Sequence, residues 1–587
     1  MRLKRTVNCG ELTEKSVNKE VILNGWVHAR RDHGGIIFVD LRDKYGLTQI
    51  VFDPKSNKES HKIAESLGRE YVIAVKGKVR LRGKGLENPK ISTGKIEVII
   101  SDIEILNKSE TPPLEIDDRI EANEEMRLKY RYLDLRRPIM QQRFQLRHNV
   151  LKAAREFMDS QGFVEVQTPM LVRPTPEGAR DYIVPSRVNP GKFYALPQSP
   201  QLYKQILMIA GFDRYYQLPA ICLRDEDLRA DRQPEHTQMD MEMSFIDEED
   251  IYNVVERMVK HIFKKTKKID LKTPFPRISY QESMDKYGTD KPDLRFSLEL
   301  ADVTEIAHKS DFEIFKKSKL VKCLPVEHDF PRSELDKISG WAISEGAKGL
   351  AWAKVTDKLE ASIAKYFPEK MQKELIKFVG AKKGYTLFFM AGSEEINPVF
   401  SKLRVRIAEQ LNLIKKDYKF CWITAFPLFE WNDEEQKWNP THHIFTSPKF
   451  EHIKYLDTDP GKVYGILYDL VLNGTELLSG SIRINKPELQ EKVMKVIGMS
   501  KEQAYKKFGF LLNAYRYGGP PHGGVGFGID RLIAILADIP GNDIREVIAF
   551  PKNKAAQCPM DDSPGDLDPI QLKEAHIKLD FVKAEKK

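Results

Sequence analysis

Cysteine is scarce in this sequence: five cysteines are scattered over 587 residues. None belongs to a CxxC pair, and none has histidines at the spacing of a zinc site. The pattern argues against a disulfide framework and against a structural zinc site. Reduced, mostly buried thiols are typical of cytosolic proteins, so we expect a cytoplasmic location.

Long apolar runs are missing as well, and none approaches the roughly 20 residues that span a bilayer, so we expect no membrane association. The opening segment, MRLKRTVNCGEL, is basic but has no apolar core behind it, and we expect no signal peptide there. An apolar fraction of 41% with a charged fraction of 31% is that of a globular protein. A chain of 587 residues exceeds what one core supports, which predicts two to four domains.

A strong net charge is also absent, since the formal value is +8 for the whole chain. Residues 1–105 hold 20 Lys and Arg against 14 Asp and Glu, so most of the surplus lies in less than a fifth of the chain. A basic module on a nearly neutral body is suited to docking a polyanion. Charge alone, however, favours the simpler interpretation of a soluble surface.

The segment 1–106 predicts an all-β module. Glycine turns separate most of its five apolar, β-branched runs, and a helical pattern at Asn57–Leu67 follows the third run. Five strands with a helix after the third is the order of an OB-fold. The runs are Val21–Val27, Ile36–Leu41, Thr48–Phe52, Tyr71–Val79 and Ile96–Ile105.

Basic and aromatic residues lie on or near the second and third runs of this module. OB-folds stack bases on exposed aromatic rings and hold the backbone with basic groups. Arg30, Phe38 and Gln49 are therefore candidates for contact with RNA. Alternation along the second run favours instead a core position for Phe38.

Residues 212–245 combine apolar runs with a highly charged block. Tyr215–Leu223 is suited to a buried strand, and Met239–Phe245 alternates like a half-buried one. Between them, Arg224–Gln238 holds three arginines, five acidic residues and two glutamines. Such a hairpin is suited to polyphosphate and an amino acid. Pro219 cannot donate to a ladder, so we expect a bulge or an edge there.

The rest of the chain predicts an α+β body with an insert. Residues 107–125 form a Pro-bearing polar linker, and 126–286 begin the main domain. The segment 144–169, a helical stripe followed by a strand and a proline, is suited to a subunit interface. Residues 287–418 change in character and predict a separate α+β insert, after which 419–587 resume the main domain.

Three stretches together resemble the motifs of class II aminoacyl-tRNA synthetases. They are the helix–strand–proline unit, the charged hairpin, and GVGFGIDR (524–531), in which three alternating glycines lead to an arginine at a strand-to-helix junction. The segments TPEGARDY, QSPQLYKQ, RDEDLRADRQPE, FTSP and GSIRI are more specifically similar to the bacterial-type aspartyl-tRNA synthetases. The similarity covers essentially the whole chain, including the insert. It implies a multidomain α+β fold, with an OB-fold anticodon domain and a catalytic domain built on an antiparallel sheet flanked by helices.

The resemblance implies a two-step reaction that uses ATP and Mg²⁺. Aspartate would attack the α-phosphate of ATP, and tRNA would then accept the aspartyl group. Arg224 is implied at the α-phosphate and Arg531 at the γ-phosphate, with Glu476 as the third catalytic residue. Asp469 and Glu476 are implied as the carboxylates that place Mg²⁺. The implied ATP-binding residues are Arg224, Asp225, Glu226, Gln233, Glu476, Gly528, Ile529, Asp530 and Arg531.

The same resemblance implies a pocket for L-aspartate. Arg483 and Lys204 would contact its side-chain carboxylate, with His442 nearby and His443 as the adjacent alternative. Two fixed cations would reject the neutral amide of asparagine. The implied aspartate-binding residues are Glu177, Gln201, Lys204, Arg224, Asp240, His442 and Arg483.

The expected partners are tRNA(Asp) and a second copy of the chain in a homodimer, with tRNA(Asn) as a further candidate. The segment ARRDHGG, with His33, and the region of Gly85 resemble relaxed enzymes that charge both tRNAs. The residues implied in tRNA recognition are Arg30, His33, Phe38, Gln49 and Gly85. Asparaginyl- or lysyl-tRNA synthetase, or a non-catalytic RNA-binding relative, are the alternatives; the last is expected to lack Arg224, Arg531 or Glu476, and all three are present.

Overall fold

The structure, a computed structural model, describes residues 1–119, 122–174, 179–226 and 228–580. The chain forms two compact units. The first comprises Met1–Asn149, Asp227–Pro234 and Ile533–Leu572, and the second comprises Val150–Glu226, Glu235–Leu532 and Lys573–Lys587. Within the described ranges, no helix is both long and apolar enough to cross a membrane, and all five cysteines are buried and unpaired.

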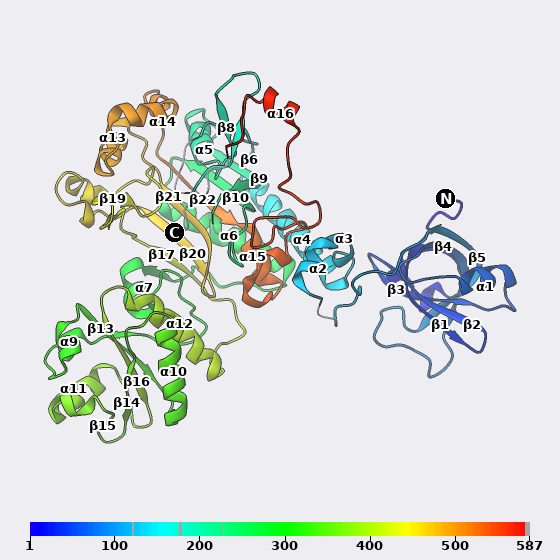
Figure 1. Ribbon diagram of the computed structural model, residues 1–587, viewed down its shortest axis with the longest axis horizontal. Helices are drawn as coiled ribbons and strands as arrows, with labels where there is room; N and C mark the ends of the chain where they lie inside the picture. The colour runs from blue at the N-terminus through cyan, green and yellow to red at the C-terminus, as the bar shows by residue number, and fades with distance from the viewer. Residues whose placement is uncertain (120–121, 175–178, 227, 581–587) are drawn as a thin grey trace. The chain divides into compact units, whose positions relative to one another are not determined.

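The first unit begins with a closed five-stranded barrel, drawn in blue in Figure 1. Its strand order, β1-β2-β3-β5-β4, and a helix after the third strand confirm the expected OB-fold. Helix α1 (Lys58–Glu65) begins where the Asn57 side chain accepts a hydrogen bond from the Ser60 amide. The strands are β1 (Glu20–His33), β2 (Ile36–Asp43), β3 (Gly46–Phe52), β4 (Val72–Leu81) and β5 (Ile96–Asn107).

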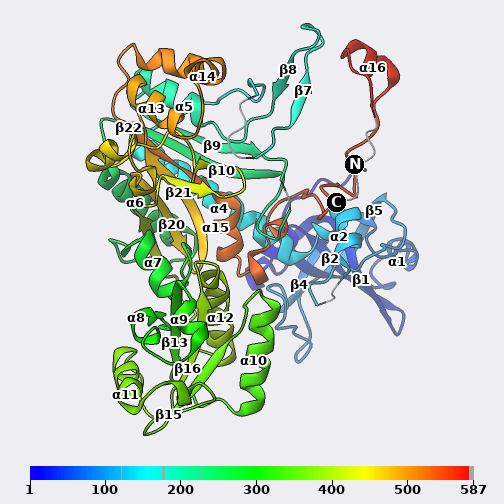
Figure 2. The ribbon, with the colours of Figure 1, turned by 60° about the vertical axis from the view of Figure 1, so that its left-hand side comes forward.

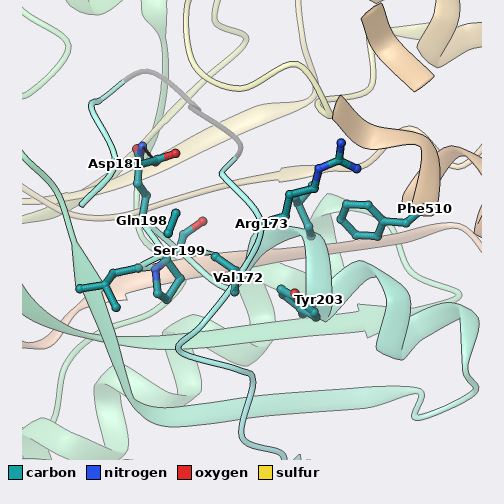
Figure 3. Close-up of a pocket in the computed structure, with 11 residues that line it drawn as sticks. Val172, Arg173, Asp181, Gln198, Ser199, Tyr203 and Phe510 are labelled. Atoms are coloured by element: carbon teal, nitrogen blue, oxygen red, sulfur yellow. Dashed lines mark hydrogen bonds between the residues drawn. The ribbon is translucent and has the colours of Figure 1, made fainter. Parts of the chain in front are cut away.

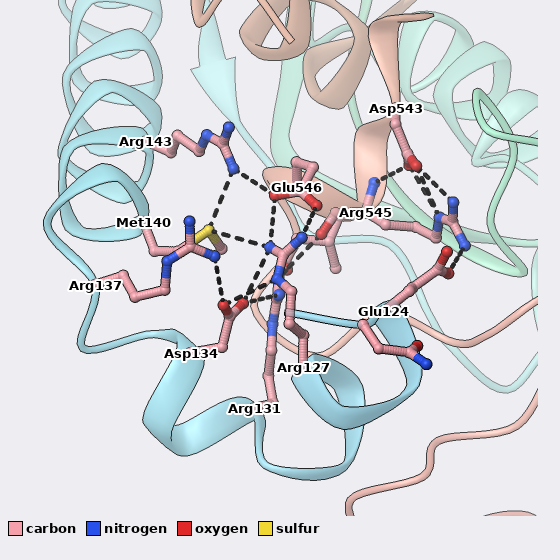
Figure 4. A network of polar contacts seen from close by, with 12 residues as sticks. Glu124, Arg127, Arg131, Asp134, Arg137, Met140, Arg143, Asp543, Arg545 and Glu546 are labelled. Carbon is pink, nitrogen blue, oxygen red and sulfur yellow. Dashed lines mark hydrogen bonds and ion pairs between the residues drawn. The ribbon is translucent and has the colours of Figure 1, made fainter. Parts of the chain in front are cut away.

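Three helices follow in the chain: α2 (Glu124–Lys129), α3 (Arg131–Asp134) and α4 (Pro138–Ser160). A cluster of arginines and carboxylates ties them to the 543–546 segment (Figure 4). Asp134 is fully buried and accepts from Arg127, Arg131 and Arg137, while Glu546 accepts from Arg127 at 2.8 Å and from Arg143. Burial alone would raise the pKa of Glu546, but the arginines outweigh it and lower that pKa to about 2.

The second unit is built on an eight-stranded sheet in the order β11-β17-β20-β21-β22-β10-β9-β6. Helix α5 (Gln201–Ile209) packs against β9 and β10, and α6 (Glu248–Thr266) packs against β22 (Figure 2). The strands are β6 (Val164–Glu165), β9 (Arg214–Leu223), β10 (Glu235–Ser244), β11 (Arg277–Ser279), β17 (Phe420–Thr424), β20 (Leu467–Leu472), β21 (Thr475–Ile482) and β22 (His522–Gly528). The other helices of the two units outside the insert are α7 (Tyr280–Tyr287), α13 (Pro487–Val496), α14 (Lys501–Tyr515), α15 (Ile529–Leu536) and α16 (Pro569–Glu574).

The centre of the sheet has two chemically different faces. On β10, Asp240 and Glu242 alternate with the buried methionines of the same strand. In register with these carboxylates, β22 presents Gly526 and Gly524. The intervening positions of β22 are the buried Val525 and Phe527, and the register continues into β21. One face of the central sheet therefore has the two carboxylates beside glycines, and the opposite face is apolar.

The strand that contains Pro219 is bulged, as the sequence predicts. Ala220 pairs with Gln238 and Gln217 pairs with Asp240, so two residues of β9 oppose one residue of β10. The bulge ends before Leu223, and β9 delivers Arg224 to the open end of the hairpin. The strand β10 begins at Glu235, earlier than the sequence pattern indicates.

The segment 287–418 contains its own five-stranded sheet, in the order β12-β13-β16-β14-β15. Buried apolar residues form a separate core on each side of this sheet. Its strands and helices are drawn in green in Figure 2. Its strands are β12 (Ala301–Asp302), β13 (Leu320–Val326), β14 (Ala351–Val355), β15 (Leu359–Glu360) and β16 (Thr386–Gly392). Its helices are α8 (Thr304–Ala307), α9 (Glu313–Lys317), α10 (Arg332–Ser344), α11 (Glu369–Phe378) and α12 (Ile396–Gln410).

Candidate active site

A buried group of alternating charges lies on the polar face of the central sheet. Lys204 reaches from α5 to within 3.1 Å of Asp240 Oδ1 and 3.3 Å of Glu242 Oε2. Arg483, directly after β21, donates from Nε to Glu242 at 2.8 Å and contacts His443 Nε2 at 2.7 Å. We call Lys204, Asp240, Glu242, Arg483 and His443 the charge cluster.

Burial and pairing set the protonation of this cluster. Burial raises the pKa of Asp240 despite the nearby Lys204. Burial also opposes ionisation of Glu242, but Arg483 and Lys204 outweigh it, and the pKa of Glu242 is lowered. Burial and the neighbouring Arg483 hold the pKa of His443 well below its usual range. His443 is therefore neutral, and its single acceptor nitrogen is contested by the Phe445 amide, 3.2 Å from Nδ1, and by Arg483, 2.7 Å from Nε2.

The cluster has unused hydrogen-bonding capacity. Among the described residues, neither Asp240 Oδ2 nor the Gln201 side-chain nitrogen has a partner, although both atoms are buried. Gln201 lies one turn before Lys204 on α5. Buried polar atoms are normally paired, so these two are suited to a polar ligand that brings its own donors and acceptors.

The glycines of β22 make room beside these carboxylates. A Cβ atom at Gly524 would lie 2.0 Å from the Met241 carbonyl oxygen and 2.2 Å from Glu242 Oε2. A Cβ atom at Gly526 would lie 2.9 Å from Gln238 Oε1. Close backbone approach thus requires glycine at position 524, whereas at position 526 the nearest atom belongs to the movable Gln238 side chain.

Only one of the two adjacent histidines contacts Arg483. His443 forms that contact, whereas His442 Nε2 lies 4.0 Å from Asp469 Oδ2 on β20. Burial lowers the pKa of His442. The structure thus brings His443 to Arg483 and His442 towards Asp469, and the role of His442 at the aspartate site stays a prediction. Glu177 lies outside the described residues.

The residues implied in ATP binding come from two junctions. Arg224 follows the end of β9 and is half-buried, and Asp225 pairs with Arg180 at 3.8 Å. Arg531, in the first turn of α15, donates to the Glu476 carbonyl at 3.0 Å. Asp530 accepts a hydrogen bond from the Thr237 amide at 2.7 Å, which ties this turn to β10.

Gly528 and Ile529 form the junction between β22 and α15. Glu226 lies in the hairpin after Asp225. Gln233 belongs to the first unit, where its side-chain oxygen accepts from the Lys552 amide at 2.8 Å. The structure thus keeps Gln233 engaged by the backbone of the C-terminal segment.

Asp469 and Glu476 form a carboxylate pair on the neighbouring strands β20 and β21. Asp469 is buried, and its Oδ1 atom has no hydrogen-bond partner among the described residues. Burial and the charge of Glu476 raise the pKa of Asp469 well above its usual range. Unpaired oxygen and excess negative charge fit a hard divalent cation such as Mg²⁺. The described ranges hold no group of three or more potential metal ligands, so phosphate oxygens would have to complete the shell.

A cavity of about 150 Å³ borders the outer side of α5 (Figure 3). Tyr203 and Phe510 lie in its wall with ring centroids 6.5 Å apart, and Arg173 stands beside Phe510. Asp181 accepts from the Gln198 amide at 2.6 Å at the opposite end. A cavity of this size, about 150 Å³, can hold one aromatic ring.

The barrel brings together some of the residues implied in RNA contact. Phe38 is half-exposed between the buried Ile37 and Val39, so the core interpretation of Phe38 is wrong. His33 lies beside it, with ring centroids 6.2 Å apart. Ile37 and Val39 take the inward positions of this strand, so Phe38 between them points outward.

The other expected RNA contacts behave differently. Gln49 is largely buried and donates to Glu97 at 2.8 Å, with Arg31 at 3.5 Å. Arg30 donates to the Ala64 carbonyl and therefore turns towards α1. Gly85 lies in the loop between β4 and β5 at a φ of 82°.

Sequence reasoning missed two residues that the structure brings to the site. Glu242 holds both cations of the charge cluster, and Lys291 lies 3.0 Å from Glu476 Oε2. The alternation in MDMEM places Glu242 on the same face as Asp240, which was the available signal. No local pattern points to Lys291, since its contact spans 185 positions of the chain.

Comparison with known proteins agrees with this geometry. A family model described as tRNA synthetases class II (D, K and N) matches residues 123–554, and one described as OB-fold nucleic acid binding domain matches residues 21–106. The chain is 49% identical over 586 residues to an aspartate–tRNA(Asp/Asn) ligase of Syntrophomonas wolfei, covering 98% of this chain and 100% of the relative. It is 48% identical over 592 residues to an aspartate–tRNA ligase of Macrococcus caseolyticus, covering 99% and 100%.

Solved structures share the fold at lower identity. An asparaginyl-tRNA synthetase from Pyrococcus horikoshii superposes with a TM-score of 0.60 at 21% identity, covering 94% of this chain and 98% of that one. An aspartyl tRNA synthetase from Entamoeba histolytica gives 0.59 at 19% identity, covering 94% and 92%. The family model and the full-length relatives establish that this chain belongs to the class II aminoacyl-tRNA synthetases, in the family of bacterial-type aspartyl-tRNA synthetases.

Proposed function

We propose that the protein is an aspartate–tRNA ligase that activates L-aspartate with ATP and transfers it to the terminal adenosine of tRNA. The observation that carries the proposal is the charge cluster, in which Lys204 and Arg483 are buried beside Asp240 and Glu242. The two cations suit the side-chain carboxylate of aspartate. The free oxygen of Asp240 and the amide of Gln201 suit its ammonium and α-carboxylate end.

Discrimination against asparagine follows from its hydrogen-bond donors. Its amide would turn an NH2 donor towards the N–H donors of Lys204 and Arg483, which are buried. A buried donor left without an acceptor costs about 1–3 kcal/mol, which corresponds to a discrimination of roughly five- to a hundredfold for each donor. Glu242 fixes both cations before the substrate arrives, so little reorganisation is needed.

Adenylate formation requires orientation and charge neutralisation. The α-carboxylate of aspartate attacks the α-phosphorus of ATP, and pyrophosphate leaves. Arg224 is suited to the α-phosphate because its planar fork can follow charge into the transition state. Arg531 is suited to the γ-phosphate. Mg²⁺, held by Asp469 and Glu476, would supply charge neutralisation at the phosphates. The remaining nucleotide contacts are those of Asp225, Glu226, Gln233, Gly528, Ile529 and Asp530.

Transfer to tRNA uses the same site from its open side. The terminal ribose hydroxyl attacks the aspartyl carbonyl, and AMP leaves. The cavity at Tyr203 and Phe510 is suited to a base of the single-stranded tRNA end, because aromatic rings stack bases of any sequence. Glu177 belongs to the proposed loop over the amino acid.

The barrel is proposed to recognise the anticodon through His33, Phe38 and Gln49, with further contributions from Arg30 and Gly85. Phe38 is half-exposed beside the exposed His33, which supports base stacking. Relatives named aspartate–tRNA(Asp/Asn) ligases are about half identical to this chain over its full length. We infer that tRNA(Asn) is charged as well as tRNA(Asp). Aminoacylation of purified tRNA(Asn) transcript tests this, and an absence of aspartyl-tRNA(Asn) would refute it.

The remaining proposals concern organisation. We propose a cytoplasmic homodimer whose interface includes the 144–169 unit. We also propose five parts: the anticodon domain (1–106), a hinge (107–125), two catalytic segments (126–286 and 419–587) and the insert (287–418).

ATP–pyrophosphate exchange tests the central proposal. Exchange is expected with aspartate and not with asparagine or lysine. The variant Lys204→Met should raise the KM for aspartate about tenfold or more, since a charge-assisted hydrogen bond contributes about 1.5–3 kcal/mol. Lys348→Met removes a surface lysine paired with Glu395 and serves as the matched control. Exchange with lysine or asparagine alone would overturn the assignment.

A further inference from the structure

Glu476 is held by two cations from different parts of the chain. Arg531 Nη1 lies 3.5 Å from its Oε1 atom, and Lys291 Nζ lies 3.0 Å from its Oε2 atom. Lys291 lies between α7 and β12, at the base of the insert and outside the stretches that resemble the synthetase motifs. The amino group therefore lies within hydrogen-bonding distance of one of the two carboxylate oxygens that Glu476 could offer to a divalent cation.

Close packing fixes the segment that carries Lys291. Helix α7 ends at Gly288, whose φ is 66° and whose added Cβ would lie 2.5 Å from the Asn397 carbonyl oxygen in α12. The next residue, Thr289, accepts the Lys291 amide through its hydroxyl at 3.1 Å. Its carbonyl accepts from the Ser283 hydroxyl at 2.6 Å, so the chain is pinned on both sides.

The insert supplies the anchor behind this segment. Lys322, on β13, is fully buried and donates to Asn397 Oδ1 at 2.8 Å and to the Met284 carbonyl at 2.7 Å. It therefore joins the insert sheet to α12 and α7 at the point where Gly288 leaves the helix. The position of Lys291 depends on this junction.

Charge gives Lys291 a role at the carboxylate pair. Among the described residues, Asp469 Oδ1 is buried without a hydrogen-bond partner, and Asp290 lies 3.8 Å from the Lys291 amino group. The negative charges of Glu476 and Asp290 both act on Asp469 and raise its pKa. The amino group of Lys291 offsets those charges and restrains the Glu476 side chain.

We propose that Lys291 is a positioning residue that holds Glu476 and competes with the divalent cation for it, and that the insert sets the position of Lys291. Before nucleotide binds, the lysine keeps the carboxylate oriented and prevents binding of a metal ion alone. Lys291 would release the Glu476 oxygen only to a cation that binds together with phosphates. The identity of the nucleotide rests on the proposed function, but the competition for Glu476 does not.

Binding of Mn²⁺ to the nucleotide-free protein, followed by the electron paramagnetic resonance of free Mn²⁺, tests the competition. Lys291→Met should bind Mn²⁺ about tenfold more tightly than the wild type, because one positive charge beside the ligand oxygen is gone. Lys291→Arg should retain the weak binding. Lys286→Met, which removes a lysine paired with Glu282 on the neighbouring α7, is the matched control and should not change the affinity.

Equal Mn²⁺ affinity of Lys291→Met and the wild type would overturn the competition. Circular dichroism establishes whether each variant folds, and Lys291→Gln replaces the methionine variant if that variant does not. Weak ATP–pyrophosphate exchange by the wild type would count against the proposed function and leave the Mn²⁺ result intact. The two failures are thus distinguishable.

Gly288→Ala tests the role of the insert. Its methyl group would push against Asn397, so we expect tighter Mn²⁺ binding in the same direction as Lys291→Met. The double variant should add little to Lys291→Met alone, because both changes act through one contact. Gly340→Ala, with open space around its Cβ, is the control. If Gly288→Ala leaves Mn²⁺ affinity unchanged, the insert does not set the lysine.

Discussion

Replacing Glu242 by glutamine tests whether the charge cluster is held as the structure indicates. Glu242 is fully buried and accepts from Arg483 at 2.8 and 3.2 Å, while Lys204 lies 3.3 Å away. The substitution keeps the shape but removes one of two negative charges opposite two cations. The amide of glutamine has one acceptor oxygen, so it can accept only one of the two hydrogen bonds that Arg483 donates to Glu242.

The expected cost follows from burial. Breaking a buried ion pair by removing one partner costs about 3–5 kcal/mol, because the other charge stays buried and unpaired. We therefore expect the Tm of the catalytic unit to fall by roughly 5–10 °C. Trp422, fully buried on β17 of the same sheet, reports the transition by its fluorescence.

Aspartate should stabilise Glu242→Gln more than it stabilises the wild type, since its carboxylate restores the missing negative charge. The control is Glu345→Gln, which breaks a pair with Lys402 at 2.7 Å on the surface of the insert. That pair should contribute at most about 1 kcal/mol. Equal melting of the two variants, or an equal aspartate effect in Glu242→Gln and the wild type, would refute the reasoning.

Three further predictions concern other parts of the molecule. The pKa of Glu546 is lowered to about 2, so its ionised form stabilises the first unit fully above about pH 4–5, and this stability is lost as the pH falls towards 2. Glu546→Gln should therefore cost about 3 kcal/mol at pH 7 and make the Tm less dependent on pH on the acid side. Gly524→Ala should abolish exchange by separating β22 from β10, whereas Gly340→Ala in α10 should be neutral or stabilising, and normal exchange by the former would contradict the register. Tyr203→Leu and Phe510→Leu should slow transfer of aspartate to tRNA in single-turnover assays and leave exchange unchanged; unchanged transfer would remove the cavity from the tRNA path.

Local pattern was sufficient for the barrel and for the hairpin around Arg224. Alternation and turn residues located all five strands of the barrel, and Pro219 in β9 predicted the bulge. Strand ends were less accurate, because pairing with β9 extends β10 back to Glu235. Alternation alone favoured the core for Phe38, although the residue was also a candidate RNA contact. Alternation gives two possible phases, and only the barrel closure decides between them.

Site residues that belong to a sequence motif could be predicted. Residues that reach the site through contacts with distant parts of the chain could not. Lys204, Asp240 and Arg483 meet as the resemblance implied. The choice between His442 and its neighbour depends on a side-chain direction that no spacing encodes. Lys291 approaches Glu476 through the packing of the insert, so its role emerges only from tertiary structure.

The two-faced centre of the sheet limits how this protein can vary. A single-residue insertion or deletion in β22 would exchange its two faces. Val525 and Phe527 would then point to the polar face beside Asp240 and Glu242, and the glycines would point into the apolar core. A systematic substitution library should therefore show a two-residue rhythm along 524–528: glycine positions that tolerate little beyond hydrogen, alternating with Val525 and Phe527, which accept other apolar side chains. Variation in substrate preference must then come from the neighbouring strands and loops, while this strand stays invariant in length.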